Sequence, residues 1–182
     1  NSRLYQLSSA ANDSNESDVQ NFSHAVYKAL PAEVLLDAIC QATAVPEKFN
    51  GWPEGYRAIQ VWDNRMPSYF FKIFGRPVRA SVCECERSNE PSIVQALHLL
   101  NAPEITAKIA HRHGRARQLA ATDLPPAQIV EELYLGTLSR LPRDEEQALM
   151  QQAFQEYGGD RRAAVEDILW ALLNSKEFVF NH

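Results

Sequence analysis

Three amphipathic segments between residues 125 and 173 constrain the fold more than any other feature of this chain. Their apolar side chains recur at the spacing of a helical face, and Pro142 and the pair Gly158-Gly159 separate one segment from the next. The inward positions are Ile129, Val130, Leu133, Tyr134, Thr137, Leu138 and Leu141 in the first segment, Leu149, Met150, Ala153, Phe154 and Tyr157 in the second, and Ala164, Val165, Ile168, Leu169 and Leu172 in the third, with Trp170 at its flank. Helices joined by short connections pack as antiparallel neighbours, so this half of the chain predicts a three-helix bundle.

The residues before this bundle carry the start signals of further helices. Pro31 suits the first turn of a helix, where its missing N–H is not needed, and Pro46 ends that segment. The inner face of this helix is Leu35, Ala38, Ile39 and Ala42. Ser92 and Gln95 have the spacing of a capping box at the start of a second helix. Its apolar face is Ile93, Ala96, Leu97 and Leu100.

A further short helix is expected between Asn101, as its cap, and His113, with Pro103 in its first turn and Gly114 at its end. The sequence therefore predicts an all-α fold, with a bundle of about six or seven helices and a long aromatic-rich loop. At 182 residues it is one domain of ordinary size, spanning residues 1–182.

Residues 49–74 form that loop, because aromatic side chains crowd a stretch interrupted by glycine and proline. Trp52, Tyr56 and Trp62 are candidates for stacking on sugar rings, with hydrogen bonds from Asp63, Asn64 and Arg65. The alternative is that the rings form a small core of their own and only pin the loop. Long connections inside compact domains are either functional or locally packed, so both interpretations remain open here.

The run Cys83-Glu84-Cys85-Glu86-Arg87 leads directly into the helix that begins after Ser92. In an extended segment the two thiols share one face and the two carboxylates the other. The pair Cys83 and Cys85 is a candidate disulfide, which would be strained and easily reduced, or a reactive thiol site. Both cysteines can equally be small buried core residues.

The polar groups around this run are Glu84, Glu86, Arg87 and His98, and they are the candidate lining of a pocket. The spacing of the two glutamates falls within the loose range of glycosidase carboxylates, but a pair beside several arginines is typical of an ion-pair network. Two sulfurs and one distant imidazole do not have the spacing of a metal site, so no metal is predicted.

Composition excludes several classes of partner. The formal net charge of −5 argues against a general nucleic-acid binder, which needs a basic surface. No run of eighteen or more apolar residues occurs, so no membrane span is predicted. The haem attachment motif Cys-x-x-Cys-His is missing, and we expect no cofactor in this domain.

Stretches spread over most of the chain resemble the family called domain of unknown function 1553, which is found in planctomycete bacteria. They are residues 30–39, 45–49, 74–77, 83–87, 91–92, 95–101 and the tail 167–182. The family forms the C-terminal domain of large proteins that also carry a cytochrome-c-like domain and a second companion domain. The resemblance implies the C-terminal piece of a larger exported protein, periplasmic or extracellular, with haem elsewhere in the parent and the other parent domains as partners. No catalytic residue is carried over, because the activity of the family is not established.

We therefore expect a non-catalytic interaction or scaffold domain of a large exported, cytochrome-associated bacterial protein. Residues 133–146 agree with this, because they are similar to a helical module of exported bacterial proteins that more often assembles than catalyses. Two alternatives stay open. One is a redox or polysaccharide-acting enzyme part that uses the segment Cys83 to Arg87, and the other is a module that binds carbohydrate through Trp52, Tyr56 and Trp62.

Overall fold

The computed structural model of the chain describes residues 3–18, 20–25, 27–62, 68–76 and 92–181, and it confirms the all-α prediction. The five longer helices are α1 (Ala32–Thr43), α3 (Ile93–Asn101), α6 (Pro126–Leu138), α7 (Asp144–Glu156) and α8 (Arg161–Leu173). Shorter helical elements are η1 (Arg3–Gln6), η2 (Ala58–Gln60), α2 (Tyr69–Ile73), α4 (Pro103–Ile109), α5 (Arg115–Ala120) and α9 (Lys176–Val179). The strands of the described residues are β1 (Lys28–Ala29) and β2 (Phe180–Asn181).

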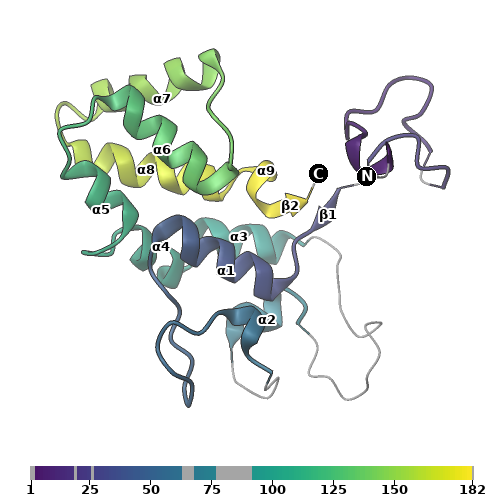
Figure 1. Cartoon of the computed structure of the whole chain (residues 1–182), viewed down its shortest axis with the longest axis horizontal. Helices are drawn as coiled ribbons and strands as arrows, with labels where there is room; N and C mark the ends of the chain where they lie inside the picture. The colour runs from purple at the N-terminus through teal and green to yellow at the C-terminus, as the bar shows by residue number, and fades with distance from the viewer. Residues whose placement is uncertain (1–2, 19, 26, 63–67, 77–91, 182) are drawn as a thin grey trace.

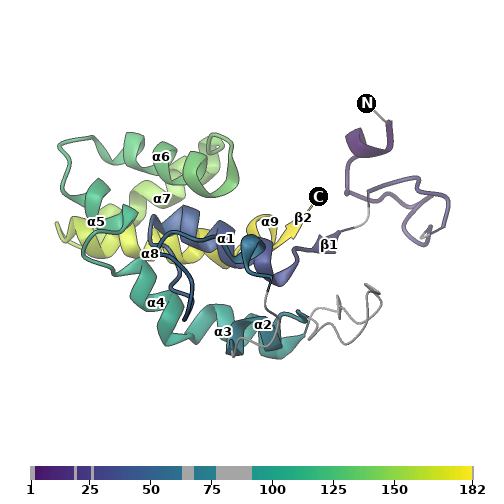
Figure 2. The ribbon, with the colours of Figure 1, turned by 60° about the horizontal axis from the view of Figure 1, so that its bottom comes forward.

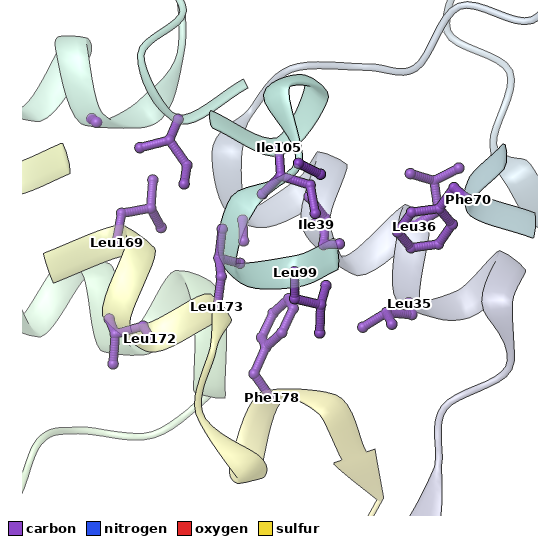
Figure 3. Close-up of a cluster of buried hydrophobic side chains, with 14 of the residues drawn as sticks. Leu35, Leu36, Ile39, Phe70, Leu99, Ile105, Leu169, Leu172, Leu173 and Phe178 are labelled. Carbon is purple, nitrogen blue, oxygen red and sulfur yellow. The ribbon is translucent and has the colours of Figure 1, made fainter. Parts of the chain in front are cut away.

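The helices are arranged in three layers. Figure 2 shows α1 and α8 in the middle, with α6 and α7 on one side and α2, α3 and α4 on the other. In agreement, α8 packs against α4, α5, α6 and α7, while α1 packs against α4 and α6. One continuous apolar core results, and Figure 3 shows side chains of α1, α2, α3, α4, α8 and α9 meeting in it.

The predicted three-helix bundle is present in α6, α7 and α8. Ile129 and Leu133 of α6 and Leu169 of α8 are fully buried. The prediction was wrong at three edge positions, because Leu141, Leu149 and Tyr157 are exposed. Leu141 lies outside because α6 ends at Leu138, and α7 lies on the outside of the bundle with no fully buried residue. Only one flank of α7, including Met150 and Phe154, packs on the core.

The predicted apolar face of α3 was also wrong. The capping box is formed, since the N–H of Gln95 lies 3.3 Å from Ser92 Oγ and the N–H of Ser92 lies 3.1 Å from Gln95 Oε1. However, Ile93, Ala96, Leu97 and Leu100 are exposed, and His98 and Leu99 are buried instead. The reason lies in the side chain of Gln95, which donates a hydrogen bond to the Ile73 carbonyl and so turns its own side of α3 towards α2.

The helix expected between Asn101 and His113 is shorter than predicted. It is α4, whose cap is Ala102, because the Asn101 amide donates to the Leu97 carbonyl instead. Gly114 precedes the next helix, α5. A Cβ atom at Gly114 would lie 3.2 Å from the carbonyl oxygens of His111, Lys108 and Thr43, so this tight passage between α1, α4 and α5 needs glycine.

The C-terminal residues return to the start of α1. Lys28 pairs with Asn181 and Ala29 with Phe180 in an antiparallel ladder. Residues 3–18 and 20–25 stand apart from the helical layers, beyond this ladder (Figure 1). None of the helices in the described ranges is both long and apolar enough to cross a membrane.

Arg140 fixes the corner between α6, α7 and α9. Its guanidinium donates to both oxygens of Glu146 at 2.7 and 2.8 Å and to both oxygens of Glu177 at 2.6 and 2.7 Å. Glu146 also accepts the backbone N–H of Arg143 at 2.7 Å. The hydrogen bonds from Arg140, with that N–H, lower the pKa of Glu146 to about 2. These contacts explain the arginine and acidic positions of the module at residues 133–146 in structural terms.

Candidate ligand-binding surface

The loop that follows α1 is anchored at three buried points. Phe49 stacks on Phe71 of α2 with ring centroids 6.3 Å apart, and Ala58 and Val61 are almost fully buried. Asp37 of α1 accepts the backbone N–H groups of Ala58 at 2.6 Å and Ile59 at 3.2 Å. Residues 49–62 are therefore a packed segment held by α1 and α2 rather than a loose connection.

A buried ion pair holds the backbone of the loop at Val61. The guanidinium of Arg76 lies 3.3 Å from the carboxylate of Glu33, and both side chains are more than nine-tenths buried. Arg76 also donates a hydrogen bond to the carbonyl of Val61 and lies over the Phe71 ring, 4.4 Å from its centroid. Because Val61 precedes Trp62 directly, this pair fixes the backbone from which Trp62 projects.

Trp52, Tyr56 and Trp62 come together on this support, and we call them the aromatic cluster. Trp52 is the central ring, with its centroid 5.2 Å from that of Tyr56 and 5.8 Å from that of Trp62. Trp52 is half-buried against the core, whereas Trp62 is 76% exposed. Trp52 and Trp62 meet edge to face, at 77°. The cluster thus has one anchored ring and one ring that lies largely in solvent.

A pocket of about 330 Å³ lies between this loop and the end of α1. Its lining is Asp37, Cys40, Gln41, Ala44, Pro46, Glu47, Gly55, Tyr56 and Arg57. Tyr56 belongs to both the pocket and the aromatic cluster, so the two are continuous. Gly55 turns the chain at this point with φ of +85°, a conformation that favours glycine. A second hollow lies on α7 and is lined by side chains of that helix alone, so it is the surface of one helix.

The charged side chains of the pocket are paired with one another or with their neighbours. Asp37 lies 3.5 Å from the Arg57 guanidinium, and Glu47 lies 3.1 Å from the Lys108 ammonium. Lys108 also donates to the carbonyls of Val45 and Pro46, at 3.2 Å each. At the rim, Lys48 and Glu54 form an exposed pair at 3.1 Å. Lys108 therefore holds the wall of the pocket in place.

Cys40 lines the pocket as a free thiol. Burial raises the pKa of this thiol, and the nearby charge of Lys108 only partly opposes the shift. The thiol is therefore protonated near neutral pH and is a poor nucleophile. The sequence did not predict Cys40 or Gln41 at a site, and the one available signal was Asp37, a carboxylate beside the predicted inner-face residues Ala38 and Ile39.

His98 does not lie at this pocket. Its ring packs between α2 and α3, with centroids 5.5 Å from Tyr69, 5.8 Å from Phe70 and 6.0 Å from Phe74. Its Nε2 atom lies 3.1 Å from a carboxylate oxygen of Glu104. His98 thus helps to pack two helices together.

The segment Cys83-Glu84-Cys85-Glu86-Arg87 lies outside the described residues, as do Asp63, Asn64 and Arg65. The predictions made for them therefore stay predictions. Arg76, which precedes these residues in the sequence, pairs with Glu33. Among the residues that the structure describes, no group of three or more histidine, cysteine, aspartate or glutamate side chains has the geometry to hold a metal ion.

A family model described as "Protein of unknown function (DUF1553)", PSD1, matches residues 1–154. This match confirms the resemblance seen in the sequence over that range, and the tail at 167–182 lies beyond it. Helix α8 also lies beyond it, although its side chains complete the core formed by α1 and α6. No curated protein and no solved structure matched the chain.

Proposed function

We propose that this chain, which belongs to the DUF1553 family of proteins of unknown function, is a non-catalytic interaction domain that binds carbohydrate through the aromatic cluster and the adjoining pocket. The observation that carries the proposal is the exposure of Trp62, at 76%, on a backbone held by buried contacts. Trp62 adjoins Trp52, which adjoins Tyr56, so its exposed ring belongs to a group of aromatic side chains, and contiguous apolar patches mark binding sites more often than single exposed residues do.

The geometry of the cluster suits the apolar face of a sugar ring. Aromatic rings provide a large, rigid contact area with few rotatable bonds, so little conformational entropy is lost when a ligand stacks on them. Trp52 is held by the core, and its edge-to-face contact restricts Trp62 before any ligand arrives. The hydroxyl of Tyr56 and the amide of Gln41 stand at the pocket, where they can exchange hydrogen bonds with sugar hydroxyl groups.

The state of the ionisable groups in the pocket favours binding over catalysis. Asp37 already accepts two backbone N–H groups and faces Arg57, and Glu47 is paired with Lys108. Cys40 is protonated near neutral pH because burial raises the pKa of its thiol. A general base or nucleophile needs a free, activated group near the substrate, and these three side chains do not meet that requirement.

The proposal includes the setting that the sequence resemblance implies. We place the domain at the C-terminal end of a large exported protein, periplasmic or extracellular, beside a domain that carries haem. The wider sequence of the parent tests this setting. A signal peptide and a Cys-x-x-Cys-His motif in the parent would support it, and a parent without an export signal would contradict it.

Calorimetric titration with a panel of hexasaccharides tests the binding function. We expect binding to at least one of them, with a loss of affinity of about fivefold or more in Trp62→Ala, by analogy with nucleobases, whose stacking on one aromatic side chain contributes roughly 1–3 kcal/mol. Leu149→Ala is the matched control, since Leu149 is 62% exposed on α7, away from the loop. Equal affinities of Trp62→Ala and the unchanged protein for every sugar that binds would overturn the assignment of the site.

A further inference from the structure

The charges of the proposed carbohydrate surface cancel locally. Three cations at or beside the pocket each have a carboxylate within reach: Arg57 with Asp37 at 3.5 Å, Lys108 with Glu47 at 3.1 Å and Lys48 with Glu54 at 3.1 Å. The surface therefore has no excess of positive charge.

This balance works against an anionic ligand. Sites that select carboxylate or sulfate groups use arginine or lysine side chains whose charge is not already compensated. Here Lys108 is nearly buried and also donates to two backbone carbonyls, so it cannot turn towards a ligand without exposing the pocket wall. An acidic sugar in the pocket would also lie beside Asp37 and Glu47, while the whole chain carries a net charge of −5.

The same arrangement suits an uncharged sugar. The aromatic rings offer apolar contact, and the hydroxyl of Tyr56 and the amide of Gln41 can form hydrogen bonds. None of these groups is charged. The pocket volume of about 330 Å³ is near the lower end of the volumes of ligand-binding sites. Tyr56 of the pocket contacts Trp52, and Trp52 contacts the exposed ring of Trp62. A ligand that contacts both regions must contain at least two linked sugar rings.

We infer that the ligand is a neutral oligosaccharide, one sugar of which enters the pocket while a neighbouring sugar stacks on the aromatic cluster. This inference rests on the proposed carbohydrate-binding function. It adds the chemical class of the ligand to that function. Chains that contain uronic acids or sulfate groups, and single sugars, are expected to bind weakly.

The test compares probes of different charge and length in calorimetry. The neutral probes are cellohexaose, xylohexaose and mannohexaose, with glucose, xylose and mannose as single sugars, and the acidic probes are hexagalacturonate and a sulfated heparin hexasaccharide. We expect at least one neutral hexasaccharide to bind about tenfold or more tightly than both acidic probes and than its own single sugar. Its affinity should change by less than about twofold between roughly 50 and 500 mM salt, because no charge is neutralised on binding.

Glu54→Gln supplies a second readout by releasing Lys48 from its exposed pair. We expect this variant to keep its affinity for the neutral hexasaccharide within about twofold, because the lost pair is worth little, and to gain affinity for hexagalacturonate. Tighter binding of an acidic probe by the unchanged protein, or a strong fall of affinity with salt, would overturn the neutral class while the carbohydrate function stands. Failure of every probe to bind would overturn both.

Discussion

The C-terminal bundle and the loop after α1 differ in the burial of their large apolar side chains. In α6 and α8 the residues at inward positions, such as Leu133 and Leu169, are fully buried. In the loop, small or aromatic anchors such as Ala58 and Phe49 are buried, while the larger Trp62 is left exposed. The buried apolar side chains of the bundle stabilise the fold, whereas in the loop one large aromatic ring remains on the surface. This difference is the basis of the proposed binding surface.

Truncation of the bundle core should have the largest effect on stability and no effect on the proposed site. Leu169→Ala removes a fully buried side chain of α8 and leaves a cavity, so we expect the free energy of unfolding to fall by about 2–5 kcal/mol. Chemical denaturation measures this loss. The folded variant should still bind the neutral hexasaccharide with unchanged affinity, and a matching loss of affinity would show that the two regions are not independent.

The buried pair of Glu33 and Arg76 should affect both stability and binding. Glu33→Gln removes the carboxylate that lies 3.3 Å from the Arg76 guanidinium, in a site where both side chains are nearly buried. We expect a loss of about 2 kcal/mol, below the roughly 3–5 kcal/mol of a fully broken buried pair, because the amide oxygen can still accept a hydrogen bond.

The binding readout separates this variant from the bundle variant. Arg76 holds the carbonyl of Val61, so glycan affinity should fall in Glu33→Gln although Glu33 does not line the pocket. Denaturation and calorimetry on the same samples give both values. Glu54→Gln, which breaks an exposed pair at the rim, is the control and should change stability by less than about 0.5 kcal/mol. A Glu33→Gln variant with full affinity would disprove the supporting role of the pair.

Acid should weaken the bundle through Glu146. Its pKa is lowered from 4.5 to about 2 in the folded chain, so its ionised form stabilises the fold above the unfolded pKa, and this contribution is lost as the pH falls from about 4.5 towards 2. Glu146→Gln should therefore show a smaller decrease of unfolding free energy over that window. Glu145→Gln, an exposed carboxylate in the same turn of α7, should behave like the unchanged protein. Parallel pH profiles for both variants would argue against the Arg140 network.

The sequence predicted the bundle well because long periodic segments report directly which side of a helix is buried. It predicted the start of α3 correctly from Ser92 and Gln95 but gave the wrong face, since a capping box marks a boundary and says nothing about orientation. Gln95 decided the orientation through a contact with Ile73, which lies 22 residues earlier in the chain. A contact between residues so far apart in the chain produces no recognisable pattern in the sequence around either of them.

The candidate site was predictable only in part for the same reason. The three aromatic residues were named from composition, and they do lie together. The pocket beside them depends on α1, because Asp37 and Cys40 approach the loop from a different element. Glu33, in the first turn of α1, is buried against Arg76, a residue more than forty positions later in the chain. Distant pairing of this kind becomes visible once the fold is known.

Indole N–H resonances test the central claim most directly, because the chain has three tryptophans and only two belong to the aromatic cluster. The third, Trp170, donates a hydrogen bond to the Leu100 carbonyl and serves as an internal reference. During titration with the neutral hexasaccharide that binds best, we predict shifts of the Trp52 and Trp62 signals with saturation and an unmoved Trp170 signal. Saturable binding that leaves Trp52 and Trp62 unmoved would contradict the account.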